Sequence, residues 1–330
     1  MKRTTIILSS IILIFSLLLL MPKKQEYSTY IHDTLGTVSQ IRIYSENDVA
    51  LSECKDYIYK MDSLLSLTNP ESEVSILNEE KEASVSPETM ELLKISLSYT
   101  DDSTFNPFCG KLIKLWDNAR EKKQLPSEED IILTDFYPPS LEFDKSKAYL
   151  KNSEQEINLG AIAKGYITDQ LVEMLDSKKI DSALISLGGN IYAKGNNKNG
   201  EPWKVGVADP DNSSEYIGIL SVTDTAIVTS GDYERYFEID GKRYHHILNP
   251  KTGYPSESGL RSVTIITPNA TLADMLSTKC FIAGFKKSKE ILKEYNSYGI
   301  FITTDNKVYF PKEIKDIFEY DEEKYEFITY

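Results

Sequence analysis

The sequence predicts an α+β fold built on a mixed, largely antiparallel sheet, and three patterns predict it. Short β-branched runs recur along the chain and end at Gly, Asn or Asp, as hairpin strands do. Stretches with Leu, Met and Tyr at helical spacing lie between these runs. The two kinds of segment follow one another in an irregular order, whereas a parallel βαβ sheet requires regular alternation.

The expected strands lie at residues 39–44, 182–187, 191–194, 203–208, 217–222, 226–229, 235–239, 263–267 and 300–303. The expected helices lie at residues 47–66, 87–100, 161–176, 271–283 and 286–295. The helix at residues 161–176 is amphipathic, because its apolar side chains recur on one face. Residues 319–330 mix acids with aromatics and are expected to form an edge strand or a loose end.

Composition and charge limit the class of protein. The chain has 330 residues, of which 41% are hydrophobic and 27% charged, as in globular proteins. Its 37 basic and 51 acidic side chains give a net charge of −14. Nucleic-acid binding requires a clustered basic surface, so we expect no nucleic-acid partner. Any anionic ligand must be held locally by backbone N–H groups, by one or two lysines or by a metal.

The cysteines do not organise the fold. Cys54, Cys109 and Cys280 are odd in number, lie far apart and form no C-x-x-C pair, which excludes a disulfide framework or a zinc ribbon. One internal disulfide and three free thiols both fit the sequence, and free buried cysteines are the commoner case.

The N-terminus has the features of a targeting segment. Lys2 and Arg3 precede an almost unbroken apolar run at residues 6–21, as in the n- and h-regions of a signal sequence. The run is near the lower length limit for spanning a bilayer, and no A-x-A-like cleavage site follows it. We therefore expect residues 1–25 to be a signal peptide or an uncleaved membrane anchor. Residues 26–330 are expected to be exported, outside or anchored to the cytoplasmic membrane in a bacterial cell envelope.

Standard catalytic motifs are absent from the sequence. There is no G-x-G-x-x-G, no Walker motif, no G-x-S-x-G and no H-E-x-x-H. Three histidines, His32, His245 and His246, argue against a multi-histidine transition-metal site. Asp, Thr, Gly-rich turns and one well-placed lysine remain, and these residue types suit hard cations and phosphates.

The segment from Asn158 to Tyr166 leads into the amphipathic helix. Small residues at a helix start expose N–H groups and the positive end of the helix dipole, and Lys164 adds a formal charge. The segment therefore suits an anion. Gly160 and Gly165 equally fit a simpler role, in which they let the helix pack closely against the sheet.

The segment from Thr271 to Thr278 allows two interpretations. In a helix, Asp274 and Thr278 are i, i+4 neighbours, so that a carboxylate and a hydroxyl can meet one small cation. Thr271 and Asp274 also have the spacing of a variant capping box, and the pair by itself favours this capping role.

His246 lies between turn-forming segments. Asn249-Pro250 and Thr252-Gly253 are turn formers, so the simplest interpretation is a hairpin loop. The alternative is that His246 serves as a base or as a ligand-positioning group, because histidine accepts a proton near neutral pH.

Taken in order, these segments resemble the motifs of the FAD:protein FMN transferase family, also called ApbE. The match covers roughly residues 35–284. The matching segments are Leu35-Gly36-Thr37, residues 72–78, Phe105-Asn106-Pro107 with Leu115-Trp116, residues 158–169, Leu187-Gly188-Gly189-Asn190, Thr229-Ser230-Gly231, residues 246–253, and Ala273-Asp274 with Thr278.

The resemblance implies one large T-fold-like domain that binds FAD with Mg²⁺. It implies transfer of FMN from FAD to a Thr or Ser hydroxyl of an exported or membrane-bound flavoprotein, with release of AMP. The implied metal ligands are the main-chain oxygen of Ala161 and the side chains of Asp274 and Thr278. His246 or Asp274 would accept the hydroxyl proton. The implied FAD contacts are Leu35, Thr104, Phe105, Asn106, Asn158, Lys164 and Leu248.

The chain departs from the family pattern at four positions. Asn106, Asn158, Asn190 and Asn249 stand where the family often has aspartate. An amide keeps the shape of a carboxylate but loses its charge and gains donors. Two alternatives to the transferase therefore remain. The first is a FAD pyrophosphatase that yields FMN and AMP, and the second is a non-catalytic exported FAD-binding protein, which the four amides favour.

Overall fold

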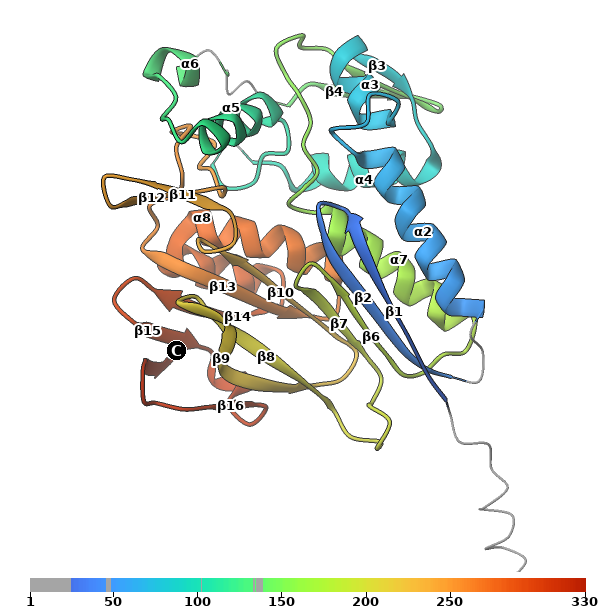
Figure 1. Cartoon of the computed structure of the whole chain (residues 1–330), viewed down its shortest axis with the longest axis vertical. Coiled ribbons are helices and arrows are strands. Elements are labelled where there is room, and N and C mark those ends of the chain that lie inside the picture. The colour runs from blue at the N-terminus through green and yellow to red at the C-terminus, as the bar shows by residue number, and fades with distance from the viewer. Residues whose placement is uncertain (1–24, 46–48, 102, 133, 135–138) are drawn as a thin grey trace, which may run out of the picture.

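The structure is a computed structural model that describes residues 25–45, 49–101, 103–132, 134 and 139–330. Within these residues the chain forms a nine-stranded central sheet, two three-stranded sheets and a two-stranded ribbon (Figure 1). The central sheet has the order β1 (Gln25–Thr34), β2 (Thr37–Ser45), β6 (Ala183–Leu187), β7 (Asn190–Lys194), β10 (Thr225–Gly231), β13 (Leu260–Thr267), β14 (Tyr298–Thr303), β15 (Lys307–Phe310) and β17 (Glu326–Thr329).

Neighbouring strands of the central sheet are antiparallel, except that β15 and β17 are parallel. The expected mixed, largely antiparallel sheet is therefore confirmed. The sheet takes β1 from near one end of the chain and β17 from the other, so the described residues form a single domain.

The smaller sheets combine hairpins with strands from distant parts of the sequence. One contains β8 (Trp203–Asp209), β9 (Asn212–Val222) and β16 (Phe318–Tyr320), and another contains β3 (Glu82–Ser84), β5 (Lys147–Leu150) and β4 (Leu141–Asp144). The ribbon pairs β11 (Tyr236–Ile239) with β12 (Lys242–His245). The helices are α2 (Val49–Leu65), α3 (Glu73–Glu80), α4 (Pro87–Tyr99), α5 (Gly110–Lys122), α6 (Glu128–Ile132), α7 (Ala163–Ser177), α8 (Ala270–Glu294) and the 3₁₀ turn η1 (Lys312–Ile314).

Both faces of the central sheet are covered. Side chains of a strand alternate between the two faces, so Ile265 of β13 packs in the cluster with the helices and Ile266 packs in the opposite cluster. Helices α7 and α8 cover the first face, and the sheet of β8, β9 and β16 covers the second (Figure 1). The α5–α6 segment and the ribbon lie beyond one end of the central sheet, near the start of α7 (Figure 1).

The main elements confirm the sequence-based predictions, with some extensions. The predicted strands and helices correspond to β2, β6–β11, β13, β14, α2, α4, α7 and α8. The two helices predicted at residues 271–283 and 286–295 are confirmed as the two parts of α8, which meet at a kink at Gly284, where φ is 75° and ψ is 161°. The tail contains β16 and the edge strand β17. The sequence did not predict β1, β3, β4, β5, β12, β15, α3, α5 or α6.

The described residues hold three free cysteines, of which Cys54 and Cys280 are buried and Cys109 is half-buried. The expectation of free thiols is therefore confirmed over that of an internal disulfide. The apolar run at residues 6–21 lies outside the described residues. Of the helices that are described, none combines the length and the apolarity needed to cross a membrane.

Candidate active site

Helices α7 and α8 approach each other closely at Gly165. A Cβ atom at this position would lie 2.3 Å from the carbonyl oxygen of Ala270 and 2.7 Å from Cβ of Asp274. Any side chain would therefore collide with the backbone of α8. The predicted packing role of Gly165 is correct, but the partner is a helix rather than the sheet.

The same contact orients one predicted metal ligand and leaves a second one without a hydrogen bond from the described residues. The Gly165 N–H donates a hydrogen bond to Oδ2 of the buried Asp274, with an N–O distance of 2.9 Å. In a continuous helix this N–H would bond the carbonyl oxygen four residues back, which belongs to Ala161. Within the described part of the chain, no hydrogen bond ends on the Ala161 oxygen. This oxygen is therefore available to a ligand at the junction of the two helices.

The start of α8 shows that the capping interpretation of Asp274 is wrong. The cap residue is Asn269, whose side chain accepts the N–H of the third helical residue at 2.6 Å. Asp169 of α7 accepts the N–H groups of Ala270 and Thr271, each at 2.8 Å, and the Thr271 hydroxyl at 2.5 Å. The first donors of α8 are thus already satisfied, and Asp274 is not needed as a cap.

Asp274 and Thr278 lie one helical turn apart on α8, and Ser230 at the end of β10 lies against this turn. The Ser230 hydroxyl is 2.8 Å from Oγ of Ser277 and 3.4 Å from Oγ1 of Thr278. A carboxylate, a hydroxyl and a main-chain carbonyl are the hard oxygen ligands that Mg²⁺ prefers, so the residues present fit this ion. Three or more His, Cys, Asp or Glu side chains do not gather into a metal-binding group anywhere in the described ranges.

Of the two histidines whose side chains the structure describes, His246 is the one with an unpartnered ring nitrogen. It follows β12, is half-buried, and donates its backbone N–H to the Arg235 carbonyl at 3.0 Å. Its Nδ1 is buried and has no hydrogen-bond partner among the described residues. Burial, then the nearby charge of Arg235 and the neighbouring His245, lower the pKa of His246 to about 3. His246 is therefore neutral at pH 7, and the same shift makes its ring a weaker base than an exposed histidine.

His245 has a structural role instead. Its Nδ1 accepts the N–H of Ile247 at 3.2 Å, and its Nε2 lies 3.1 Å from the Ser256 carbonyl oxygen. Both ring nitrogens are therefore in use. The side chain of His32 lies outside what the structure describes.

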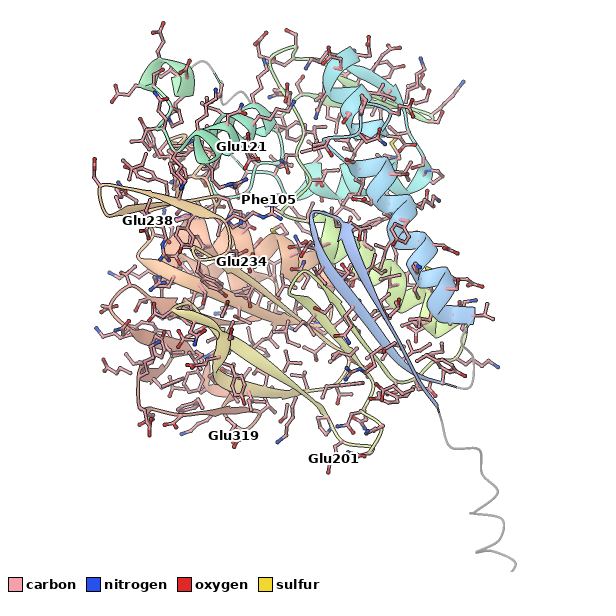
Figure 2. The ribbon with its side chains drawn as sticks, in the orientation of Figure 1. Phe105, Glu121, Glu201, Glu234, Glu238 and Glu319 are labelled. Carbon is pink, nitrogen blue, oxygen red and sulfur yellow. The ribbon has the colours of Figure 1, made fainter. Side chains whose placement is uncertain are left out.

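Charged groups surround the helix junction. Burial of the carboxylate raises the pKa of Glu234, although part of the residue is exposed to solvent. The positive charges of Lys164 and Arg235 oppose this shift, and the negative charge of Asp274 adds to it. These couplings place Glu234 within electrostatic reach of the starts of both helices. Lys164 bonds back to the Gly160 carbonyl at 3.2 Å. Figure 2 shows Glu234 and Phe105 near the middle of the molecule, whereas Glu201 and Glu319 lie at its lower edge in this view.

The predicted flavin-binding segment is folded around Asp101. Thr104 and Phe105 are buried, and the Thr104 hydroxyl donates to Asp101 at 2.7 Å. Leu248 is also buried, in a cluster with Trp116. Side chains of these predicted contacts therefore point into the protein, which leaves backbone groups and neighbouring side chains to meet a ligand.

The turn that contains Leu35 is connected to the segment of Arg235 and His246. Leu35 lies between β1 and β2 with φ 53°, and its N–H donates to Asp62 of α2 at 2.8 Å. The carbonyl of the next residue, Gly36, accepts a hydrogen bond from Arg235 at 3.4 Å. Because Arg235 also contacts His246, the turn is connected to the predicted base.

Three of the four asparagines that replace aspartate form local turns. The side-chain oxygens of Asn106, Asn158 and Asn249 each accept the backbone N–H two residues ahead, at 2.9 Å in all three cases. Only the oxygen is used in these bonds, and a carboxylate oxygen would serve equally. Asn190 differs, because it is buried and its Nδ2 has no partner among the described residues.

Two residues of the resembling segments hold the site together, although their role was not predicted. Asn78 of α3 accepts the Ile157 N–H at 2.6 Å and donates to the Ile157 carbonyl at 2.8 Å, which fixes the residue before Asn158. Trp116 of α5 donates its indole N–H to the Gly253 carbonyl at 2.7 Å. Both residues lie in segments that resemble the family motifs, and this was the signal from which their importance could have been predicted. Asp169 has the same signal, because it ends the resembling segment at residues 158–169, whereas Asp101 lies outside the resembling segments.

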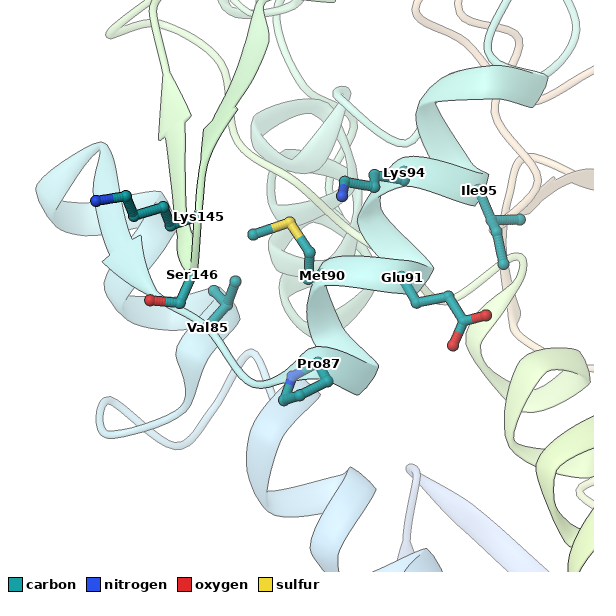
Figure 3. A pocket seen from close by; sticks show the side chains of 8 residues that line it. All are labelled: Val85, Pro87, Met90, Glu91, Lys94, Ile95, Lys145 and Ser146. Carbon is teal, nitrogen blue, oxygen red and sulfur yellow. The ribbon is translucent and has the colours of Figure 1, made fainter.

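One cavity lined by described residues does not involve the predicted site. It has a volume of about 480 Å³ and lies between α4 and the turn of β4 and β5 (Figure 3). Its lining residues are Val85, Pro87, Met90, Glu91, Lys94, Ile95, Lys145 and Ser146. A much smaller cleft lies beside His246, and its lining includes Trp116, Arg235 and Leu248.

Solved structures share this architecture. The ApbE protein from Thermotoga maritima superimposes with a TM-score of 0.81 and 31% identity, covering 89% of this chain and 99% of that one. A variant of the flavin transferase ApbE from Vibrio cholerae superimposes with a TM-score of 0.76 and 25% identity, covering 88% and 99%. The fold is therefore that of the flavin transferases.

Sequence comparison gives the family. The model described as ApbE family matches residues 35–302. The FAD:protein FMN transferase of Treponema pallidum is 34% identical over 306 residues, covering 83% of this chain and 84% of that protein. The Klebsiella pneumoniae protein of the same name is 32% identical over 283 residues, covering 83% and 88%. The chain belongs to the ApbE family of FAD:protein FMN transferases.

Proposed function

We propose that this protein transfers FMN from FAD to a Thr or Ser hydroxyl of an exported or membrane-bound flavoprotein, releases AMP and requires Mg²⁺. The observation that carries the proposal is the junction of α7 and α8. There Gly165 orients Asp274 and leaves the Ala161 carbonyl available. The names of the relatives support the two flavin nucleotides and the protein acceptor.

Ala161, Asp274 and Thr278 would hold the Mg²⁺ ion. When bound, this ion supplies positive charge that neutralises phosphate oxygens around the bond that breaks. The Gly165 N–H keeps the Asp274 carboxylate in place before any ligand arrives. Such preorganisation is the main way in which proteins assist phosphoryl transfer.

The start of α7 would hold the phosphates. Its N-terminal N–H groups and dipole favour negative charge, and Lys164 in the first turn adds a full positive charge. The net charge of the chain is −14, so this local arrangement has to compensate for repulsion from the rest of the protein.

His246 would accept the proton of the acceptor hydroxyl. The hydroxyl oxygen then forms a bond to the phosphorus of the FMN moiety, the pyrophosphate P–O bond breaks, and AMP leaves. His246 suits this role better than Asp274 in geometry, because the Nδ1 atom of His246 has no hydrogen-bond partner among the described residues. Oδ2 of Asp274 is already engaged by Gly165.

The turn-forming role of Asn106, Asn158 and Asn249 weakens the case for a non-catalytic FAD-binding protein. The loss of charge at these positions leaves the local structure intact. A FAD pyrophosphatase uses the same site and differs only in accepting water, so the acceptor decides between the two activities.

The test incubates the full chain with FAD and Mg²⁺, with and without flavoproteins from the membrane and exported fractions of the same cell. Chromatography follows AMP and FMN, and mass spectrometry follows the acceptor. The matched variant is Asp274→Asn, which keeps an oxygen for the Gly165 N–H and removes the charge. We expect an FMN-sized mass gain on an acceptor Thr or Ser, lost with EDTA and reduced at least about 100-fold in the variant.

Two outcomes would contradict the proposal. AMP and free FMN without a modified acceptor would indicate a pyrophosphatase. Intact FAD under every condition would indicate a binding protein. The localisation is tested separately, by fractionating cells that produce the full chain and a form without the apolar run at residues 6–21, because that run is the feature that supports export.

A further inference from the structure

The carboxylate of Asp101 is the centre of the loop that precedes α5. Its Oδ1 accepts the Ser103 N–H at 2.7 Å, the Ser103 hydroxyl at 3.0 Å and the Thr104 N–H at 2.6 Å. Its Oδ2 accepts the Thr104 hydroxyl at 2.7 Å. The Asp101 N–H donates to the Phe105 carbonyl at 2.8 Å, which closes the loop. One side chain therefore fixes the backbone that leads into residues 104–106.

The same carboxylate is tied to α8. Nζ of Lys279 lies 2.5 Å from Oδ2 of Asp101, and the two side chains are 13% and 31% exposed. Because the pair is largely shielded from solvent, it is screened less than a surface ion pair. Lys279 directly follows Thr278, one of the predicted metal ligands.

The ion pair thus joins two parts of the site that are far apart in the sequence. One part is the segment Thr104-Phe105-Asn106, which the resemblance assigns to FAD. The other is the turn of α8 that carries Asp274 and Thr278. Successive helical residues point about 100° apart, so the turn that presents Thr278 to the helix junction presents Lys279 to the Asp101 loop.

We propose that Asp101 and Lys279 are positioning residues that hold the FAD-binding segment against the helix of the metal ligands, an inference that rests on the proposed function. Without the ion pair, the loop keeps its internal hydrogen bonds but loses its fixed place on α8. Binding FAD then requires ordering the loop, which lowers affinity. Asp274, Thr278 and His246 stay in place, so turnover of bound FAD continues.

The test uses the full chain with Lys279→Met, which removes the charge and keeps a long side chain. The matched control is Lys307→Met, which breaks the Lys307–Asp305 pair of 2.7 Å in the β14–β15 turn. Lys279→Arg retains the charge and serves as the conservative variant. Measurements are the Kd for FAD from flavin fluorescence, KM and kcat for FMN transfer, and the thermal midpoint.

We expect Lys279→Met to raise the Kd and KM for FAD about 10-fold and to leave kcat at saturating FAD within about 2-fold, a split typical of lost binding. Lys279→Arg should restore most of the affinity, and Lys307→Met should match the wild type. Asp101→Asn combined with Lys279→Met should be no worse than the more affected single variant, because both act through one contact.

Three results would overturn the inference. The first is unchanged FAD affinity in Lys279→Met. The second is a lower kcat and thermal midpoint with an unchanged KM, which indicates a merely structural role. The third is a wild-type chain that does not bind FAD, which would overturn the proposed function as well. The first two leave the proposed function standing.

Discussion

Gly165 and Asp274 are joined by a hydrogen bond of 2.9 Å between a backbone N–H of α7 and a side-chain oxygen of α8. The bond forms where the two helices are so close that no side chain fits at residue 165. A contact required for packing therefore also sets the direction of a carboxylate that we assign to metal binding. Stability and activity are expected to depend on the same few atoms.

We predict that Gly165→Ala destabilises the protein by about 2 kcal/mol or more, because the added methyl group would overlap the Ala270 carbonyl. The matched control is Gly160→Ala, whose Cβ would meet only the Asn158 side-chain oxygen, at 3.0 Å. Urea unfolding of both variants provides the measurement. Equal stability of the two variants would show that the helices can separate without cost.

Asp169 caps α8 from the neighbouring helix. We expect Asp169→Ala to lower the free energy of unfolding by about 2 kcal/mol, because it leaves the N–H groups of Ala270 and Thr271 without their acceptor. Asp305→Ala, which removes a partner from an exposed ion pair, should cost less than about 0.5 kcal/mol. Denaturant unfolding compares the two, and a cost for Asp169→Ala no greater than that of the control would contradict the capping role.

His246 makes stability depend on pH in a defined direction. Its pKa is about 3 in the folded protein, whereas an unfolded chain has a value of about 6.5. Between these values the unfolded state binds a proton that the folded state does not, so stability falls as the pH is lowered below about 6.5.

We therefore predict that His246→Gln loses less stability than the wild type between about pH 7 and pH 5, by about 2 kcal/mol. Unfolding in urea at each pH gives the comparison. Parallel curves for the two proteins would show that His246 is not responsible. His245, whose pKa burial also lowers, remains in both proteins and contributes equally to each.

The asparagines that form turns should tolerate the carboxylate. We predict that Asn106→Asp, Asn158→Asp and Asn249→Asp each shift the thermal midpoint by no more than about 2 °C, because only the side-chain oxygen is used in the turn. Calorimetry on the single variants tests this. A large loss at any of the three positions would mean that its amide N–H group makes a contact essential to the fold.

The sequence predicted the elements whose patterns are strongest. Strands β10 and β13 could be recognised because they contain consecutive β-branched residues. Helices α4 and α7 could be recognised because their apolar residues recur at helical spacing. The strands β3, β4 and β5 are three or four residues long, and no periodicity can be measured over such a length. Helix α6 has five residues and begins with three acids, so its apolar face is too small to recognise.

The candidate site was predictable only as a set of residues. The i, i+4 spacing correctly placed Asp274 and Thr278 on one face of a helix. The capping role considered for Asp274 was wrong, because Asn269 is the cap of α8. Spacing cannot show that Asp169, a hundred residues earlier, already satisfies the first N–H groups. The Asp101–Lys279 ion pair is likewise a contact between distant segments, and neither residue has a local pattern that indicates it.

The break at Gly284 has a consequence for how the protein tolerates change. A residue inserted in a regular helix turns everything beyond it by about 100°. In α8 the backbone leaves helical geometry at Gly284, with a φ of 75° that side chains rarely adopt. Across the break, the Ser288 hydroxyl donates to the carbonyl oxygens of Cys280 and Gly284, each at 2.9 Å, so the ten residues that follow are tied to the first part of the helix. A residue inserted beyond Gly284 would turn these ten residues away from that contact, while the turn of Asp274 and Thr278 would keep its orientation.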